Sequence, residues 1–329
     1  MREQLLEILD RFPKQRMVVV GDPIADEFLY GRIARVSREA PVLVLEYGDL
    51  VRVPGGAANA AHNLLELGCA VSVAGFAGRD EAGDGIEALL RGKGADTRAF
   101  MRLGSCSTPV KTRILAGAHH SAPQQVVRID RTPENFPSPS SLWPRLRGPL
   151  RHADGIVVSD YGYGSIDETL YQRLRAAAVE RGIPIVVDSR FHMNRFHGAT
   201  SITPNITELE SAAGIVIDGD SRLLARTARG AMKRQQLDSL LVTQGRFGMT
   251  LFRKRKPPLQ IPVYGTDEVA DVTGAGDTVI AVYTLALACG APAEDAARLA
   301  NYAAGIVVMK RGTATTTCTE LRAAVEADA

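Results

Sequence analysis

The chain has 329 residues, of which 45% are apolar and 23% are charged, as is usual for a globular domain. Its 39 basic residues nearly balance its 37 acidic ones, so the sequence lacks the strong basic bias that nucleic-acid binding favours. Because no apolar run is long enough to span a membrane and no signal-peptide core opens the chain, we expect a soluble, cytoplasmic protein with no membrane or nucleic-acid partner.

Short runs of aliphatic and β-branched residues recur along the chain and predict buried parallel strands. These runs are Met17–Val20, Ala70–Ala74, Gly155–Ser159, Ile183–Val187 and Ser239–Thr243. Such runs suit strands buried on both faces, and the intervals between them leave room for crossover helices. The pattern predicts an α/β fold with a mostly parallel central sheet covered by helices, in a single domain over residues 1–329.

Two regions interrupt this alternation and predict a second, smaller β-sheet. Residues 32–53 and 108–130 read as extended segments with no helix between them. A small sheet inserted at these two points could cover a site, so we interpret it as a lid. The adjacent His119 and His120 would point apart on a strand and have no third ligand nearby, which favours a lid-tip loop over a metal site.

Asp and Gly residues stand at the carboxyl ends of several of the predicted strands. They are Asp22, Asp160, Asp188 and Gly245. In open α/β sheets ligands bind beyond the carboxyl ends of the strands, although Asp and Gly also simply terminate strands. Their gathering at one sheet edge favours a binding site there.

A glycine-rich turn precedes the long apolar stretch from Val279 to Pro292. Gly274, Ala275 and Gly276 leave the backbone bare, and Asp277 follows them. Exposed N–H groups at a helix start attract anions, so the turn predicts a phosphate cradle. Asp277 suits either a proton acceptor or a helix N-cap, and the spacing alone leaves both roles open. The lack of a following GK[ST] excludes a Walker A loop.

Several motifs together resemble the PfkB, or ribokinase-like, carbohydrate kinases. "DVTGAGDT" (271–278) closely resembles the second family signature, and "PGGAANAAHNLLELG" (54–68) resembles the first. "GDPIADEFLYG" (21–31), "TPNITELE" (203–210) and "VTQGRFGMTLF" (242–252) are similar to the sugar, NxxE and nucleotide segments. The motifs span about residues 17–318 in the family's order. The resemblance implies a ribokinase-like three-layer fold with a lid and transfer of the γ-phosphoryl group of ATP to a sugar hydroxyl.

The resemblance also implies roles for individual residues. Asp277 matches the catalytic base, and the N–H groups of Gly274, Ala275 and Gly276 match the anion hole. The implied sugar contacts are Asp22, Asp26, Gly55, Gly56 and Asn59. The implied Mg²⁺ and nucleotide contacts are Asn205, Glu208, Thr243, Gly245, Gly248 and Asn301. A site for a monovalent cation such as K⁺ would begin at Asp271 and Thr273 and be completed by carbonyls near Val307, Lys310, Gly312 and Thr316.

Within the family, several segments resemble the D-glycero-β-D-manno-heptose-7-phosphate kinase branch. They include "VSREAPV" (36–42), "QQVVRID" (124–130) and "SDYGYG" (159–164). This implies a sugar-phosphate acceptor, but two lysines of that branch are replaced, by Tyr163 and by Arg190 of an Asp-Ser-Arg segment. The candidate contacts to the acceptor are Lys111, Arg113, Arg128, Asp160 and Arg190.

Two other functions stay open, and one is excluded. The same fold could phosphorylate another sugar, sugar phosphate or nucleoside, or it could bind a sugar or nucleotide without catalysis. A Rossmann dehydrogenase is excluded because no GxGxxG motif opens the first βα unit. Relatives pair their lids, and an uncovered small sheet exposes edges and an apolar face, so we expect a homodimer formed through the lid.

Overall fold

The computed structural model describes residues 1–117, 123–133, 136–265, 271–310 and 312–328. Among them, nine strands form one sheet: β1 (Arg16–Gly21), β4 (Ala70–Gly78), β5 (Asp96–Leu103), β8 (Gly155–Asp160), β9 (Ile185–Ser189), β10 (Ser201–Ile202), β11 (Ser239–Thr243), β12 (Met249–Arg253) and β13 (Leu259–Ile261). Their order is β13-β12-β11-β10-β9-β8-β1-β4-β5. Strands β5 to β11 in this order pair in parallel, and β12 and β13 extend the sheet as antiparallel strands. The predicted mostly parallel sheet is confirmed.

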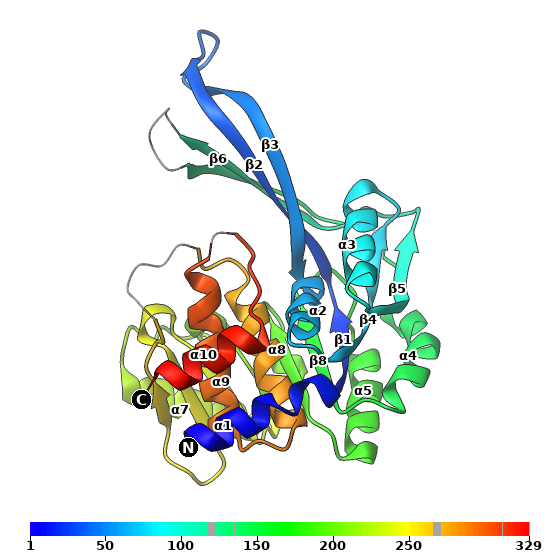
Figure 1. The fold of residues 1–329 in the computed structure, drawn as a ribbon, viewed down its shortest axis with the longest axis vertical. Helices are drawn as coiled ribbons and strands as arrows, with labels where there is room; N and C mark the ends of the chain where they lie inside the picture. Colours follow the sequence, from blue (N-terminus) through cyan, green and yellow to red (C-terminus); the bar gives the residue numbers. More distant parts are fainter. Residues whose placement is uncertain (118–122, 134–135, 266–270, 311, 329) are drawn as a thin grey trace.

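Helices cover both faces of this sheet (Figure 1). They are α1 (Arg2–Leu9), α2 (Ala57–Glu66), α3 (Glu81–Gly92), α4 (Trp143–Leu150), α5 (Glu168–Arg181), α6 (Ile206–Ala213), α7 (Ser221–Gln235), α8 (Ala275–Ala288), α9 (Ala293–Val308) and α10 (Cys318–Ala327). Side chains of β1 alternate between two cores, since Val19 packs toward α2, α8 and α9, whereas Val18 and Val20 pack toward α4, α5 and α7. Helix α8 is apolar on almost all sides because it packs against the sheet, α2 and α9.

A four-stranded sheet projects from the body as the expected lid (Figure 1). Its strands are β2 (Pro23–Val36), β3 (Leu43–Gly56), β6 (Val110–Gly117) and β7 (Gln124–Arg131), in the order β3-β2-β6-β7. The lid begins at Pro23, directly after β1, rather than near residue 32 as the sequence suggested. The pair His119 and His120, expected at the lid tip, falls outside the described residues.

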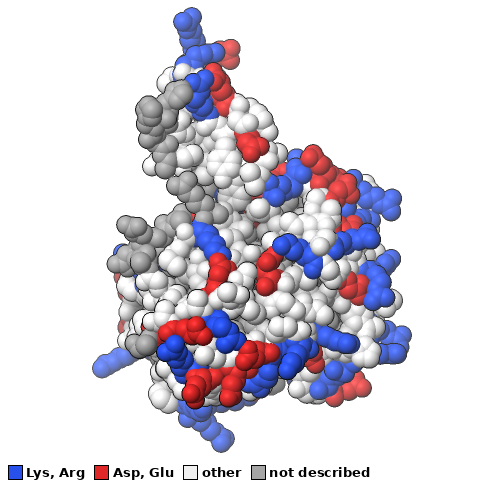
Figure 2. Space-filling view, in the orientation of Figure 1, with Lys and Arg blue, Asp and Glu red and all other residues white. Residues whose placement is uncertain are grey.

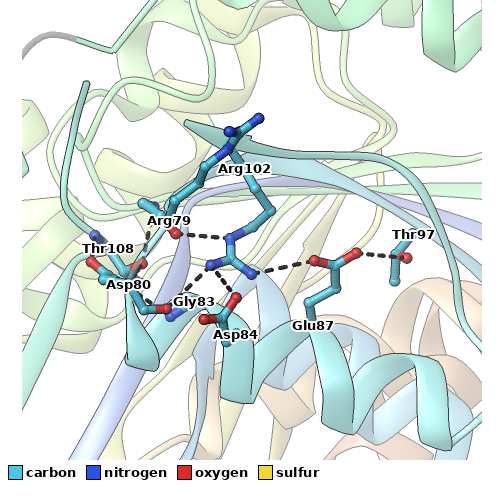
Figure 3. Close-up of polar contacts among 9 residues, drawn as sticks. Arg79, Asp80, Gly83, Asp84, Glu87, Thr97, Arg102 and Thr108 are labelled. Carbon is cyan, nitrogen blue, oxygen red and sulfur yellow. Dashed lines mark hydrogen bonds and ion pairs between the residues drawn. The ribbon is translucent and has the colours of Figure 1, made fainter. Parts of the chain in front are cut away.

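The root of the lid is fastened to α3 by a polar cluster (Figure 3). The Arg102 guanidinium contacts Asp84 at 2.8 Å and Glu87 at 3.3 Å. Thr108, just before β6, donates to the Asp80 carboxylate through its backbone N–H at 2.8 Å and its hydroxyl at 2.6 Å. These contacts fix the second lid segment where it leaves the body. No helix in the described part of the chain is long and apolar enough to cross a membrane.

Candidate active site

The turn before α8 has a geometry that only glycine supports. Gly274 lies in the left-handed region at φ +80°, and a Cβ there would stand 2.6 Å from Asn59 Nδ2 and 2.7 Å from Thr313 Cγ2. The Ala275 N–H already donates to the Val272 carbonyl at 3.3 Å. The next two N–H groups, of Gly276 and Asp277, have no hydrogen-bond partner among the described residues. The turn therefore offers two donors and the positive end of α8 to an anion.

Asp277 sits in the first turn of α8 and is only 2% exposed. Its Oδ2 accepts a hydrogen bond from Asn59 Nδ2 at 2.9 Å, and its Oδ1 accepts one from the Tyr161 hydroxyl at 2.9 Å. Burial raises the pKa of Asp277 to about 6, and the two hydrogen bonds oppose that rise because they favour the ionised form. The side chain is thus a carboxylate tuned to accept a proton near neutral pH.

Tyr161 is a site residue that the sequence reasoning did not identify. It lies directly after β8, in the segment "SDYGYG", at the same sheet edge as Asp160. Its position could have identified it, because residues that follow parallel strands lie at the edge of the sheet where ligands bind. The hydrogen bond to Asp277 spans 116 positions, so spacing gave no indication of it.

Two acids expected at the sugar also organise the loop after β8. Asp22 accepts three backbone N–H groups at 2.9–3.0 Å, those of Tyr161, Tyr163 and Ser165. Asp160 accepts the Ser189 hydroxyl at 2.7 Å. These hydrogen bonds give both residues a part in organising the loop after β8, and the direct sugar contact that the resemblance implied for both stays a prediction.

Asp26 and the double glycine lie at the root of the lid. Asp26 forms an ion pair with Arg113 at 2.6 Å, so this arginine already has an acidic partner. A Cβ on Gly55 would stand 2.4 Å from Asp26 Oδ2, and one on Gly56, at φ +55°, 2.6 Å from the Asp22 carbonyl oxygen. The glycines therefore let β3 pass close beside these acids.

Lys111 brings a positive charge to the site. Among the described residues its ammonium forms no ion pair, and it lies 4.4 Å from the centre of the Tyr161 ring. Burial lowers its pKa, and the nearby Arg190 lowers it further, whereas Asp26 and Asp277 raise it. A half-buried ammonium without an ion pair, close to the candidate base, is suited to an anionic substrate.

Arg190 and Arg128, the other two candidate cations, are exposed to solvent. Arg190 is exposed and stacks on Phe191, with its guanidinium carbon 5.7 Å from the ring centre. Arg128 stands opposite Arg113 in the β6–β7 register and pairs with Asp130 at 2.8 Å. Of the four candidate cations, Lys111 and Arg190 form no ion pair among the described residues and are therefore available to a ligand.

A group of acids lies beside the turn. Asn205 and Glu208 cap α6 reciprocally, since the Glu208 N–H donates to Asn205 Oδ1 at 2.8 Å and the Asn205 N–H donates to Glu208 Oε2 at 2.9 Å. Burial raises the pKa of Asp188, and the negative charges of Glu208 and Asp277 raise it further. Among the described residues, no group of three or more His, Cys, Asp and Glu side chains could hold a metal ion by itself.

Three of the residues expected to contact Mg²⁺ and the nucleotide line one open pocket. A cavity of about 810 Å³ is bordered by Asn205, Thr243 and Gly245. Gly248, at φ +78°, serves the turn between β11 and β12, because a Cβ there would meet the Ile261 carbonyl oxygen at 2.1 Å. The Asn301 amide donates to the Pro262 carbonyl at 2.8 Å, so it is engaged with the backbone instead.

The segments expected to bind a monovalent cation include oxygen atoms that could accept further contacts. Asp271 accepts the N–H groups of Thr273 at 2.9 Å and Gly312 at 3.2 Å. The Thr316 hydroxyl is fully buried and has no hydrogen-bond partner among the described residues. A buried oxygen without a partner is costly, which makes this hydroxyl a candidate ligand.

Val307 and Lys310 of that loop also form contacts within the protein. The Val307 carbonyl accepts the Lys310 N–H at 3.0 Å. The Lys310 ammonium donates to the Thr315 carbonyl at 2.7 Å and pairs with Glu320 at 2.6 Å. These contacts tie the loop after α9 to itself and to α10.

Comparison with known proteins gives consistent relatives. The bifunctional protein HldE of Citrifermentans bemidjiense is 40% identical over 328 residues, which cover 98% of this chain and 66% of that protein. HldE of Azotobacter vinelandii is 41% identical over 319 residues, covering 97% of this chain and 65% of that protein. The chain thus spans about two thirds of the length of these curated relatives.

Solved structures share the fold. Arabidopsis thaliana ribokinase complexed with ribose and ATP superposes with a TM-score of 0.76 at 20% identity, over 95% of this chain and 99% of that one. Escherichia coli phosphofructokinase-2 in complex with potassium gives 0.74 at 17% identity, over 95% and 98%. The family model described as pfkB family carbohydrate kinase matches residues 16–320. The chain therefore belongs to the pfkB family of carbohydrate kinases.

Proposed function

We propose that residues 1–329 form a single kinase domain that transfers the γ-phosphoryl group of ATP to the anomeric hydroxyl of D-glycero-β-D-manno-heptose 7-phosphate. The observation that carries this proposal is the buried carboxylate of Asp277 beside the free N–H groups of the α8 turn and the unpaired ammonium of Lys111. The base, the anion cradle and a cation for a second phosphate lie together, as phosphorylation of a sugar phosphate requires.

Asp277 acts as the general base. It accepts the proton of the acceptor hydroxyl while that oxygen bonds to the γ-phosphorus and the bond to the β-phosphate oxygen breaks, which leaves ADP. A carboxylate offers about four lone-pair directions, so the two existing hydrogen bonds leave room for a substrate hydroxyl. The N–H groups of Gly276 and Asp277 stabilise the charge on the transferring group.

Lys111 and Arg190 hold the distal phosphate of the acceptor. Arg113 is paired with Asp26, and Arg128 is paired with Asp130, so we assign neither of them to the distal phosphate. Asp26 stays the proposed ligand of a sugar hydroxyl because it borders the glycines of β3. The heptose assignment is supported by the segments that resemble this branch and by the relatives named HldE.

ATP extends from the α8 turn toward Asn205, Thr243 and Gly245, which border the open pocket. The residues beside it fit a divalent cation, because Asp188 and Glu208 are acids whose pKa values are raised by burial. Bound there, Mg²⁺ would neutralise charge on the phosphates, with Asn205 and Glu208 holding its water shell. Full turnover in excess EDTA would remove this assignment.

Asp271 and the buried Thr316 hydroxyl fit a monovalent cation near the start of α8. An ion such as K⁺ would add positive charge behind the anion cradle. Turnover that stays unchanged when K⁺ is replaced by a large organic cation would remove this site.

Lid sheets pair two copies of the chain. One apolar row crosses all four lid strands, because four residues stand opposite one another in the strand register: Leu50, Leu29, Ile114 and Val127. Val127 is 46% exposed, and uncharged residues cover much of the lid face visible in Figure 2. A second copy would cover this row and remove it from water.

The function is tested by supplying ATP and a panel of acceptors and measuring ADP release. We expect the heptose 7-phosphate to give the highest kcat/KM. Equal turnover of ribose or fructose 6-phosphate would leave the family assignment standing and remove the heptose proposal.

A further inference from the structure

We propose that Tyr161 is a positioning residue of the phosphoryl transfer: its hydroxyl orients the carboxylate of Asp277, and its ring supports the ammonium of Lys111. One side chain would then join the candidate base to the cation that receives the distal phosphate. This inference rests on the proposed function, since it assigns Tyr161 a part in the same site.

The contacts of Tyr161 leave it little freedom. Its backbone N–H is held by Asp22 at 2.9 Å, directly after the end of β8. Its hydroxyl donates to Asp277 Oδ1 at 2.9 Å, and its ring centre lies 4.4 Å from the Lys111 ammonium. Together with the bond from Asn59 to Oδ2, the phenol fixes both oxygens of the base, so the carboxylate cannot rotate freely.

Charged groups around Asp277 and the hydrogen bond from the Tyr161 hydroxyl together set how readily Asp277 ionises. Asp26 on β2 raises the pKa of Asp277, and Lys111 on β6 lowers it, while Asp188 on β9 also lies close enough for its charge to interact with that of Asp277. The Tyr161 hydroxyl favours the ionised carboxylate and lowers its pKa against the effect of burial. Loss of this donor therefore raises the pKa of Asp277 above about 6, toward the pH at which the base must work.

The test is the pH profile of Tyr161→Phe, which removes the hydroxyl and keeps the ring under Lys111. The acid limb of kcat/KM should move up by about one pH unit, and kcat at pH 6.5 should fall about threefold, with a smaller loss at pH 8. The KM for the acceptor should change less than about twofold, since the cation–π contact remains. The acceptor phosphate titrates equally in both profiles, so the difference between enzymes isolates Asp277.

Two further variants sharpen the result. Tyr161→Leu removes ring and hydroxyl, so it should raise the acceptor KM as well as move the limb. Tyr171→Phe is the matched control, because it removes a buried hydroxyl that donates to the His197 carbonyl at 3.0 Å, on α5 and away from Asp277. It should leave the limb in place.

An acid limb of Tyr161→Phe that coincides with the wild-type limb would overturn the proposal. If that variant does not fold, 3-fluorotyrosine incorporated at position 161 gives the reciprocal test: a stronger donor should move the limb down, and an unmoved limb overturns the inference. Full activity of Asp277→Asn would instead remove the proposed base. An inactive Asp277→Asn with an unmoved Tyr161→Phe limb removes only the role of Tyr161.

Discussion

The amide of Asn59 donates a hydrogen bond to the carboxylate of Asp277 at 2.9 Å and joins two signature segments that lie 218 positions apart. Asn59 is itself fully buried, and its own oxygen accepts a hydrogen bond from Asn63 at 3.1 Å. This hydrogen bond from Asn63 orients the amide of Asn59 so that its N–H faces Asp277. The asparagine expected at the sugar thus acts on the candidate base.

The first prediction concerns Asn59→Asp. Two carboxyl groups in hydrogen-bond contact share one proton, so the pKa of the Asp277 site rises above its value of about 6. Activity at pH 7 should fall by about tenfold or more and should recover as the pH rises toward 9. Steady-state rates across this range measure the effect. A variant whose acid limb coincides with that of the wild type would contradict the account.

The second prediction concerns the stability of Asp277→Asn. The folded pKa of Asp277, about 6, is raised above its ordinary value of 3.8, so this carboxyl favours folding below pH 4 and loses that contribution as the pH rises through 6. Above pH 6 the charge costs about 3 kcal/mol at most. An asparagine can accept from Asn59 and donate to the Tyr161 oxygen, so the variant should melt a few degrees higher than wild type at pH 8.

At pH 4.5 that gain should shrink, because the wild-type carboxyl is then protonated. Thermal melts at the two pH values provide the comparison. An equal difference at both values would show that the burial of a charge is not its cause.

The third prediction concerns Lys111→Met. A charge-assisted contact to phosphate contributes about 1.5–3 kcal/mol, so the KM for the sugar phosphate should rise about 10- to 100-fold, with the KM for ATP nearly unchanged. Lys254→Met is the control, since Lys254 lies on the exposed β12–β13 loop beside Asp238. An unchanged acceptor KM would move the phosphate site elsewhere.

Much of the fold could be predicted from the sequence because its signals are local. Buried parallel strands need continuous β-branched runs, and Met17–Val20 and Gly155–Ser159 fall inside β1 and β8. The turn at Gly274 was visible because a bare backbone at a helix start has few other uses. The lid was visible as extended segments without helices, although its first strand begins at Pro23.

The contacts within the site could not be predicted, because they depend on which side chains the fold brings together. Asp22 stands at a strand end, where a residue that binds a ligand is expected, yet its carboxylate accepts hydrogen bonds from three backbone N–H groups. Arg113 reads as a free cation, yet Asp26 neutralises it. Tyr161 lies in the segment "SDYGYG" that resembles the heptose branch, but that motif assigns it no role, and only the packing of the loop after β8 directs its hydroxyl to Asp277.

The fourth prediction concerns the lid. Val127→Glu places a charge in the apolar row that a second copy would cover, so it should convert a dimer to a monomer in light scattering at micromolar concentration. Val179→Glu, at an exposed valine of α5, should stay dimeric. A wild-type monomer, or a Val127→Glu dimer, would contradict lid pairing.

The most direct measurement is the turnover of D-glycero-β-D-manno-heptose 7-phosphate with ATP by the wild type and by Asp277→Asn. The account predicts ADP release by the wild type with a kcat/KM above that for ribose, fructose 6-phosphate, fructose 1-phosphate and adenosine. It predicts that Asp277→Asn binds ATP normally and loses about 10²- to 10⁴-fold in kcat. A variant that keeps more than about half of the wild-type turnover would contradict the assignment of Asp277 as the base of this kinase.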